Sequence, residues 1–311
     1  MTLPNLHQQT PLFENVEINT RLQQRVYLKM DCFQPIGSFK IRGIGLRCQE
    51  AVQSGITHLI SSSGGNAGLA AAYAGRRLGA QVTVVVPETT SPTAQRRIAA
   101  EGAEVIVHGS VWDEANRFAL QLVDELDGAY VHPFDHPTIW LGHATMIDEL
   151  VGQCSKPEVM VVSVGGGGLL CGLLEGLHRH EWTDVPVLAV ETEGAASLAA
   201  SLKSGRLETL PAITSIAATL GARQVTPQVL AWSKRHLLSS VVVSDQDAVK
   251  ACLQFADDLR VVVEPACGAA LSLIYDNHRH LAGYESVLMI VCGGAGVTIQ
   301  QLLAWHEQFQ K

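Results

Sequence analysis

Continuous runs of apolar, β-branched residues alternate with alanine- and leucine-rich segments along this chain, and this alternation restricts the possible folds most strongly. A strand that is apolar on both sides must be buried on both faces, as in a parallel sheet covered by helices. The expected strands lie within 57–63, 80–87, 103–109, 159–165, 185–191 and 286–294. The expected helices lie within 66–79, 93–102, 111–126, 169–180 and 248–259. The pattern predicts an α/β fold with open, mostly parallel sheets, each covered by helices.

The chain is long enough for two such domains, since it has 311 residues. A composition break falls at "VHPFDHPTIW" (131–140), which is rich in proline and histidine. We therefore expect a small α/β domain over 32–136. The larger α/β domain is expected to combine 1–31 with 137–311, so that the N-terminal arm packs on it.

Composition and charge exclude several classes of protein. Hydrophobic residues make up 47% of the chain and charged residues 17%, which is typical of a globular protein. The net charge is −8 and no basic block exceeds a pair of arginines, so a nucleic-acid partner is not expected. The apolar stretch 159–177 contains four consecutive glycines, which favour a strand, a turn and a buried helix over a membrane span.

Cysteine usage and the first residues bear on location. The chain has 7 cysteines, an odd number, and no CxxC pair. Its start, "MTLPNLHQQTP", lacks the charged and apolar regions of a signal peptide. Both features predict free thiols in a reducing, cytoplasmic environment.

Glycine-rich loops follow several of the expected strands. They read "SSSGGNAG" (61–68), "SVGGGGLLCG" (163–172) and "VCGGAG" (291–296). Ligands of parallel sheets bind at such loops, beyond the carboxyl ends of the strands. The run Gly165 to Gly168, placed before a helix, favours a bound phosphate over a simple packing turn. Its spacing fits neither a nucleoside-triphosphate loop nor a dinucleotide fingerprint.

Two readings stay open for the first of these loops. Asn66 is either the N-cap of the next helix or a ligand-binding amide. Ser61, Ser62 and Ser63 are either turn and cap residues or, with bare N–H groups, part of a site for an amino-acid carboxylate.

Lys40 stands in "QPIGSFKIRG" (34–43), among small and apolar residues. Such a lysine is often an ordinary solvated residue. A desolvated lysine, however, has a lowered pKa and can form a Schiff base with an aldehyde. Together with a phosphate-binding loop, Lys40 makes pyridoxal 5′-phosphate one hypothesis for the ligand.

Several motifs occur in one order and make a family resemblance specific. They are "PIGSFKIRG", "SSSGGNAGLAAAYAGRRLG", "SVGGGGLLCG", "EPACGAAL" (264–271) and "VCGGAG". The chain resembles the serine/threonine dehydratases of the tryptophan-synthase-β-like pyridoxal-phosphate family, which has fold type II. It is most similar to the short catabolic L-serine dehydratase group and its dehydratase-like relatives. The resemblance runs from about Thr10 to the end.

The resemblance implies a role for each matched residue. Lys40 matches the Schiff-base lysine, Phe39 the aromatic beside the cofactor ring, and Cys292 the residue facing the pyridine nitrogen. Asn66 matches the residue that bonds the cofactor 3′-hydroxyl. The phosphate-binding residues would be Gly165, Gly166, Gly167 and Gly168. The substrate-carboxylate residues would be Ser63, Gly64, Gly65, Asn66 and Ala67. A monovalent-cation site, suited to potassium, would involve Glu191, Ala195, Leu220 and Ala222.

The sequence departs from the family pattern at two places. Gly64 stands at a position that resembles an alanine position of the serine-specific relatives. We expect the missing methyl group to enlarge the space beside the substrate. Ala295 and Gly296 stand where relatives often have a polar pair, near the expected position of the pyridine ring.

The implied reaction is a β-elimination that deaminates L-serine to pyruvate and ammonia, and L-threonine to 2-oxobutyrate and ammonia. Lys40 would serve as the general base, and the cofactor phosphate would protonate the departing hydroxyl. A neutral thiol at Cys292 would limit charge build-up in the ring. The family likeness also implies a homodimer.

Other activities remain open on the sequence. They are threonine dehydratase, serine racemase and cysteine synthase within the family, and a non-catalytic amino-acid or nucleotide sensor outside it. A racemase would need a second acid/base group, which the Ser61–Ser63 loop could supply. The intact Lys40 argues against a sensor.

Overall fold

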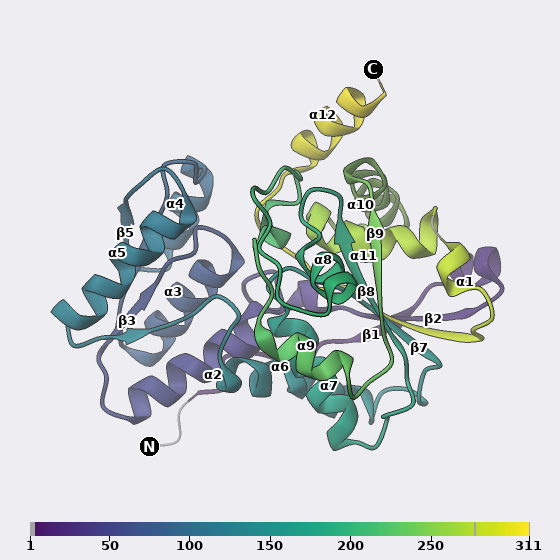
Figure 1. Cartoon of the computed structure of the whole chain (residues 1–311), viewed down its shortest axis with the longest axis horizontal. Helices are drawn as coiled ribbons and strands as arrows, with labels where there is room; N and C mark the ends of the chain where they lie inside the picture. Colours follow the sequence, from purple (N-terminus) through teal and green to yellow (C-terminus); the bar gives the residue numbers. More distant parts are fainter. Residues whose placement is uncertain (1–3, 277, 311) are drawn as a thin grey trace. The chain divides into compact units, whose positions relative to one another are not determined.

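The computed structural model describes residues 4–276 and 278–310 and divides the chain into two compact units. Of the described residues, unit 1 comprises 4–8 and 34–143. Unit 2 comprises 9–33 and the described residues from 144 onward. Each unit has its own sheet and its own covering helices (Figure 1). No helix in the described part of the chain is both long and apolar enough to cross a lipid bilayer.

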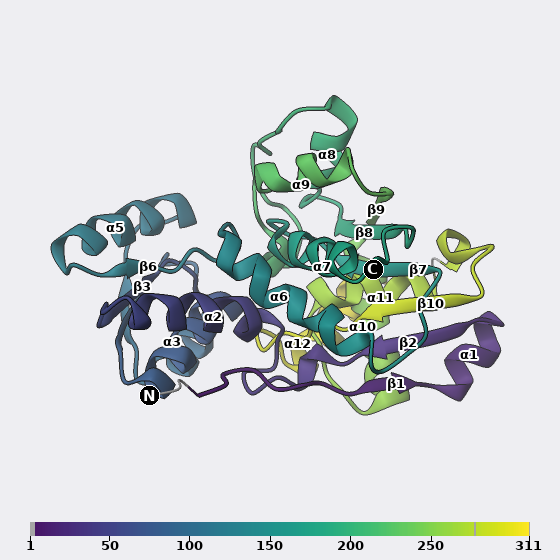
Figure 2. The same ribbon diagram turned by 90° about the horizontal axis from the view of Figure 1, so that it is seen from below.

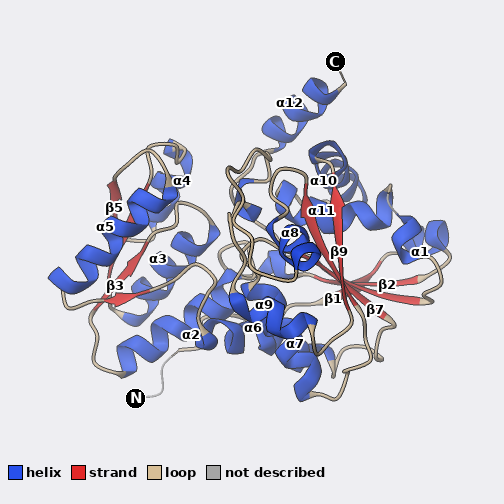
Figure 3. Cartoon of the chain, viewed as in Figure 1, coloured by secondary structure: helices blue, strands red, loops and turns tan. Residues whose placement is uncertain are grey.

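Unit 1 contains a four-stranded parallel sheet in the order β5-β4-β3-β6. Its strands are β3 (His58–Ser61), β4 (Gln81–Val86), β5 (Glu104–Val107) and β6 (Ala129–Tyr130). Its helices are α2 (Lys40–Gln53), α3 (Asn66–Leu78), α4 (Pro92–Ala100) and α5 (Trp112–Glu125). Figure 3 shows these strands in red with helices on both sides.

The core of unit 1 follows the alternation of side chains along the strands. Leu59 and Val84 point to the face packed by α2 and α3, whereas Ile60 and Val85 point to the face packed by α5. The first of these clusters also includes Leu6, which is 2% exposed. Burial of Leu6 therefore attaches the described N-terminal residues to unit 1.

Unit 2 contains a six-stranded sheet in the order β1-β2-β10-β7-β8-β9. All neighbours pair in parallel except the edge strand β1, which is antiparallel to β2. The strands are β1 (Leu12–Glu14), β2 (Arg25–Lys29), β7 (Val159–Ser163), β8 (Val187–Thr192), β9 (Leu238–Val243) and β10 (Ser286–Ile290). Figure 2 shows β2, from the start of the chain, beside β10, from its end.

The helices that lie within unit 2 are α1 (Val16–Leu22), α7 (Gly168–Arg179), α8 (Ser197–Ser204), α9 (Pro227–Ser233), α10 (Asp245–Leu259), α11 (Pro265–Tyr275) and α12 (Ile299–Phe309). A further helix, α6 (Pro137–Leu150), begins in unit 1 and ends in unit 2. The buried helix α11 packs on β7, β8 and β10, and α10 packs on α11. The short 3-10 helices are Asp31–Phe33, Ala218–Leu220 and His278–Leu281.

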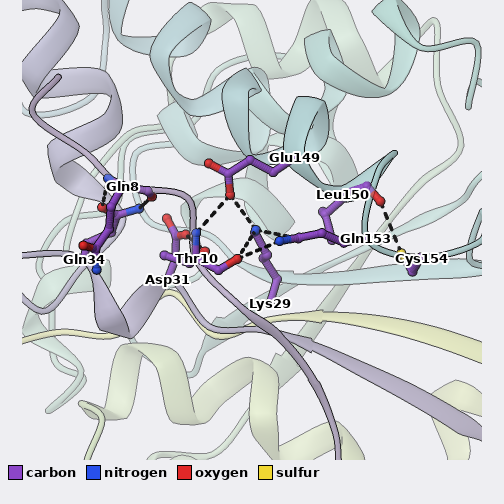
Figure 4. Close-up of polar contacts among 9 residues, drawn as sticks. All are labelled: Gln8, Thr10, Lys29, Asp31, Gln34, Glu149, Leu150, Gln153 and Cys154. Atoms are coloured by element: carbon purple, nitrogen blue, oxygen red, sulfur yellow. Dashed lines mark hydrogen bonds and ion pairs between the residues drawn. The ribbon is translucent and has the colours of Figure 1, made fainter.

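A buried ion pair holds the N-terminal arm of unit 2 against α6 (Figure 4). Lys29 is 0% exposed, and its Nζ lies 2.5 Å from the Glu149 carboxylate. The same ammonium donates to the Thr10 carbonyl and to the Gln153 side chain, both at 2.8 Å. Burying a charge is costly unless it is paired and hydrogen-bonded, and here every proton of the ammonium has an acceptor.

The structure confirms the α/β class, and each expected strand and helix segment contains an element of the expected type. The unit boundaries differ from those expected at 32 and 136. Residues 4–8 belong to unit 1 because Leu6 is buried there, not to the larger unit as expected. The first half of α6 also belongs to unit 1, because Gly43 of α2 packs tightly against Ile139.

Candidate active site

Lys40 begins helix α2 in unit 1, directly after Phe39. Its Nζ donates a hydrogen bond to the Pro133 carbonyl at 2.5 Å and lies 5.2 Å from the centre of the Phe39 ring. The side chain is half-buried. The structure therefore brings Lys40, Phe39 and the proline-rich loop together, although the sequence assigned Pro133 no function.

The loop between β3 and α3 carries the expected substrate residues. Gly65 is the N-cap of α3, and no side chain caps this helix among the described residues. Asn66 is therefore not the N-cap; it is the first helical residue and only 8% exposed. The start of a helix of 13 residues whose N-cap is a glycine suits an anion such as a carboxylate.

The serines of this loop have different surroundings. The Ser62 hydroxyl donates to Asn116 at 2.8 Å and lies 2.9 Å from the Tyr130 hydroxyl. Tyr130 also donates to Asn116, so these side chains form one polar network behind the loop. Burial raises the pKa of Tyr130 to about 12, which keeps the phenol a neutral donor. Ser61 is fully buried, and its hydroxyl has no partner among the described residues.

The Thr90 side chain lies close to Gly64. A Cβ built on Gly64 would lie 2.5 Å from Cγ2 and 2.6 Å from Oγ1 of Thr90. Thr90 therefore lies where a methyl group on residue 64 would project, and the effect of the missing methyl on the space beside the substrate stays a prediction. Sequence reasoning missed Thr90, since nothing local in "PETTSP" (87–92) indicates which loop it touches.

His132 is a second neighbour of Lys40 that the sequence did not assign to the site. Its Nδ1 accepts hydrogen bonds from the N–H groups of Phe134 and Asp135, at 3.1 and 2.7 Å. Burial lowers the pKa of His132 to about 4, and the positive charge of Lys40 contributes. The imidazole is therefore neutral at physiological pH, with its proton on Nε2.

The glycine run of unit 2 forms the turn between β7 and α7. Gly167 is the N-cap of α7 with φ of 89°, and no side chain caps this helix among the described residues. A Cβ on Gly167 would meet Val229 at 2.4 Å, and a Cβ on Gly165 would lie 3.1 Å from the Leu220 Cα. The turn thus combines a left-handed residue, close backbone packing and bare N–H groups, which fits a phosphate.

Cys292 lies just beyond β10 and is 5% exposed. A hydrogen bond with Cys267 and burial raise the pKa of its thiol well above the ordinary value. A neutral thiol is the species expected opposite an unprotonated ring nitrogen. The described residues contain 7 cysteines, all of them free.

Glu264 organises the loop that follows Cys292, a role the sequence did not reveal. Its carboxylate accepts from the Thr219 hydroxyl at 2.5 Å and from the Gly296 N–H at 3.4 Å. Gly294 has φ of 129°, and a Cβ there would lie 2.0 Å from the carboxyl carbon of Glu264. The loop that contains Ala295 and Gly296 is thus held through the backbone N–H of Gly296. This is compatible with two residues that lack polar side chains.

The residues of the expected cation site lie in unit 2. Glu191 is 0% exposed and accepts from the N–H groups of Leu198 and Ala199, at 2.7 and 2.8 Å. Burial raises the pKa of this carboxyl to about 7. Ala195 and Leu220 are buried, and Ala222 donates its N–H to the Leu220 carbonyl at 2.7 Å. Among the described residues no group of three or more His, Cys, Asp or Glu side chains could hold a metal ion.

The predicted site residues are thus divided between the units. Unit 1 contains Phe39, Lys40, Ser63, Gly64, Gly65, Asn66 and Ala67. Unit 2 contains Gly165, Gly166, Gly167, Gly168, Glu191, Ala195, Leu220, Ala222 and Cys292. Within unit 2 the structure brings Gly165 of the phosphate-type turn against Leu220 of the expected cation site.

Two mainly parallel sheets covered by helices, a lysine at one helix start and a glycine turn at another are features of the pyridoxal-phosphate enzymes with fold type II. The profile of the family described as "Pyridoxal-phosphate dependent enzyme" matches residues 3–293, and the chain belongs to this family.

Individual relatives cover nearly the whole chain. It is 44% identical to an L-serine dehydratase of Dictyostelium discoideum, over 97% of this chain and 92% of the relative. It is 46% identical to an L-serine dehydratase/L-threonine deaminase of Mus musculus, over 98% and 96% of the two chains. Its structure is similar to that of an L-serine ammonia-lyase from Rhizomucor miehei, with a TM-score of 0.94, 36% identity, and coverage of 98% and 100%.

Proposed function

We propose that the protein is a pyridoxal-phosphate-dependent ammonia-lyase. It converts L-serine to pyruvate and ammonia, and L-threonine to 2-oxobutyrate and ammonia. The observation that carries this proposal is the sequence identity of 44% to an L-serine dehydratase, over 97% of this chain. The bound cofactor would supply an electron sink for the negative charge that develops at the substrate Cα.

Lys40 is the residue proposed to bind the cofactor aldehyde and to remove the Cα proton. Its position at the start of α2, with Phe39 beside its ammonium, supports both roles. Phe39 would pack on the cofactor ring, and Asn66 would bind the 3′-hydroxyl. Cys292 would face the ring nitrogen, and its raised pKa favours a neutral partner there.

Two helix starts are proposed to bind the anionic groups. The turn of Gly165, Gly166, Gly167 and Gly168 would hold the cofactor phosphate at the start of α7. The loop of Ser63, Gly64, Gly65, Asn66 and Ala67 would hold the substrate carboxylate at the start of α3. In both places the N-cap is a glycine, which has no side chain to bond the first N–H groups of the helix.

A monovalent cation, with potassium as the first choice, is proposed at Glu191, Ala195, Leu220 and Ala222. The pKa of Glu191 is raised to about 7 by burial, so its ionised form would gain from a bound cation. Carboxylate and carbonyl oxygens are hard ligands that suit such an ion.

The remaining proposals concern assembly and location. We expect a cytoplasmic homodimer, acting on free amino acids, without nucleic-acid or membrane partners. The net charge of −8 is consistent with the absence of a nucleic-acid surface. The larger unit, which contains the glycine turn and Cys292, would bind most of the cofactor.

The test is release of 2-oxo acid from L-serine and L-threonine by the purified protein with pyridoxal phosphate and potassium. Lys40→Ala should lower the rate by about a thousandfold or more, because it removes the base and the cofactor attachment. Lys234→Ala, at an exposed lysine, is the matched control and should keep full activity. A folded, cofactor-loaded protein that releases no 2-oxo acid would exclude the proposed function.

A further inference from the structure

Two hydrogen bonds meet at one peptide unit beside Lys40. The carbonyl of Pro133 accepts from the Lys40 Nζ at 2.5 Å, and the N–H of Phe134 donates to Nδ1 of His132 at 3.1 Å. This carbonyl and this N–H belong to the same peptide unit, which is trans. In a planar trans unit the two groups point in opposite directions. His132 therefore lies on one side of the peptide unit and the Lys40 nitrogen on the other.

This peptide unit has little freedom to rotate. The pyrrolidine ring of Pro133 fixes the φ of that residue. Nδ1 of His132 also accepts from the next N–H, that of Asp135, at 2.7 Å, so one nitrogen holds two successive peptide units. The Phe134 carbonyl accepts from the Trp140 indole at 2.9 Å. The direction of the Pro133 carbonyl thus depends on the side chains that bind its neighbours.

His132 can accept these two bonds only while its Nδ1 carries no proton. Burial lowers the pKa of His132 to about 4; the charge of Asp135 opposes this shift, and the charges of Lys40 and His136 add to it. The imidazole is therefore a neutral acceptor at physiological pH. A bond donated by the N–H of a peptide unit polarises that unit, so the carbonyl on its other side becomes a better acceptor.

We infer that His132 is a positioning residue for Lys40, which acts through the peptide unit between Pro133 and Phe134. The imidazole directs the Pro133 carbonyl, and the carbonyl holds the Lys40 nitrogen. This inference rests on the proposed function, because Lys40 is the residue proposed to remove the Cα proton. A base that is displaced by about 1 Å can lose about a hundredfold in rate, so a fixed position matters for that role.

Two substitutions separate the acceptor of His132 from its ring. His132→Asn removes the ring but keeps an oxygen that can accept from the same two N–H groups, as asparagine does in turns. His132→Phe has no acceptor but keeps a ring for the edge contacts with Tyr130 and Phe134, whose ring centres lie 5.8 and 4.7 Å from the imidazole. Positioning through the peptide unit requires the asparagine variant to work and the phenylalanine variant to fail. A packing role requires the reverse.

The first readout uses the cofactor-free protein and needs no turnover. Acetic anhydride reacts with the free amine of a lysine, and a hydrogen bond to the Pro133 carbonyl favours the unreactive ammonium form. Acetylation of Lys40, measured by peptide mass spectrometry relative to the exposed Lys234, should rise about tenfold in His132→Phe. In His132→Asn it should stay within about threefold of the native value.

Turnover of the cofactor-loaded protein gives the second readout. In His132→Phe the kcat for L-serine should fall at least about tenfold while KM changes less than about threefold, because the substrate still binds but the base is displaced. The isotope effect of α-deuterated L-serine on kcat should rise, since proton removal becomes the slower step. His132→Asn should keep kcat within about threefold of the native value.

His136→Phe is the matched control, because it removes a similar bond from the same loop. Nδ1 of His136 accepts from the Thr138 N–H at 3.2 Å and does not bind the peptide unit beside Lys40. This variant should keep the native labelling and kcat. Native labelling of Lys40 in His132→Phe, or faster labelling in a folded His132→Asn, would overturn the inference. Because labelling needs no catalysis, this result is distinct from a failure of the proposed function.

Discussion

The β3–α3 loop of unit 1 and the β7–α7 turn of unit 2 have the same plan, yet they need glycine for different reasons. Both follow a parallel strand and end in a glycine N-cap without a capping side chain. In the β7–α7 turn, Gly167 has φ of 89° and Gly165 packs on the Leu220 backbone. In the β3–α3 loop, Gly64 has no positive φ, and the nearest atoms that a Cβ on Gly64 would meet belong to the Thr90 side chain.

The shape of the β7–α7 turn is therefore fixed by its own backbone, whereas the shape of the β3–α3 loop depends on a neighbouring side chain. A backbone that must be left-handed and closely packed tolerates no side chain, which suits a group as invariant as a phosphate. A loop whose shape depends on a neighbouring side chain changes with one substitution elsewhere. We therefore expect binding of the cofactor phosphate to depend on the turn of unit 2, and substrate selection on the loop of unit 1.

The largest effect should come from Gly167→Ala. The left-handed conformation and the contact with Val229 at 2.4 Å together should cost about 2–4 kcal/mol of stability. Affinity for pyridoxal phosphate should fall at least about tenfold, since the turn must open. Gly205→Ala is the matched control, because Gly205 has φ of 73° and nothing within 4 Å.

Unfolding in urea and titration with the cofactor measure both effects. The control isolates the left-handed strain, so it should lose only about 1–2 kcal/mol and keep its cofactor affinity. Equal losses of stability in Gly167→Ala and Gly205→Ala would mean that the contact with Val229 adds nothing to the cost of the left-handed conformation.

An intermediate, pH-dependent effect is expected at Glu191. Burial raises the pKa of this carboxyl from 4.5 to about 7, so the folded protein binds the proton more tightly than the unfolded chain. Its contribution to stability is therefore greatest below pH 4.5 and falls as the pH rises to about 7. Potassium should reduce this loss, because it stabilises the ionised form.

Thermal midpoints at about pH 5 and about pH 8, in potassium and in tetramethylammonium chloride, test the Glu191 account. Potassium should raise the midpoint mainly at the higher pH, and Glu191→Gln should abolish the difference between the salts. An equal potassium effect in Glu191→Gln would place the cation elsewhere.

The smallest effect is expected for a substitution of Tyr130, which lies behind the β3–α3 loop. Tyr130→Phe removes the hydroxyl that joins Ser62 and Asn116, and should cost about 1 kcal/mol in stability. The KM for L-serine should rise more than the dissociation constant of the cofactor, because the network lies behind the substrate loop and the phosphate turn belongs to the other unit. Tyr73→Phe is the control, since its ring contact with Arg76 at 5.5 Å survives the change. A fall in cofactor affinity as large as the rise in KM in Tyr130→Phe would remove the proposed separation of roles.

The sequence predicted the elements that local pattern determines. Buried parallel strands such as β4 and β7 are dominated by valine, and α3 is rich in alanine and ends at Gly79 in a left-handed conformation. Strand β9 was missed because it begins with Leu238 and two serines, and α11 because its glycine and proline obscure a helical pattern.

The candidate site was predictable only where one segment carries the signal. The glycine turns and Lys40 stand out within short stretches of sequence. The contacts Gly64–Thr90 and Thr219–Glu264 join loops that are distant along the chain, and no local pattern encodes such pairs. Leu6 likewise gives no sign of the core it joins.

Reduction of the cofactor-loaded protein with borohydride, followed by peptide mass spectrometry, identifies the lysine that binds the cofactor. The reagent fixes pyridoxal phosphate to the lysine that holds it. We expect a single labelled peptide with the pyridoxyl group on Lys40. A label on another lysine, or none on a protein that releases pyruvate from L-serine, would contradict this expectation.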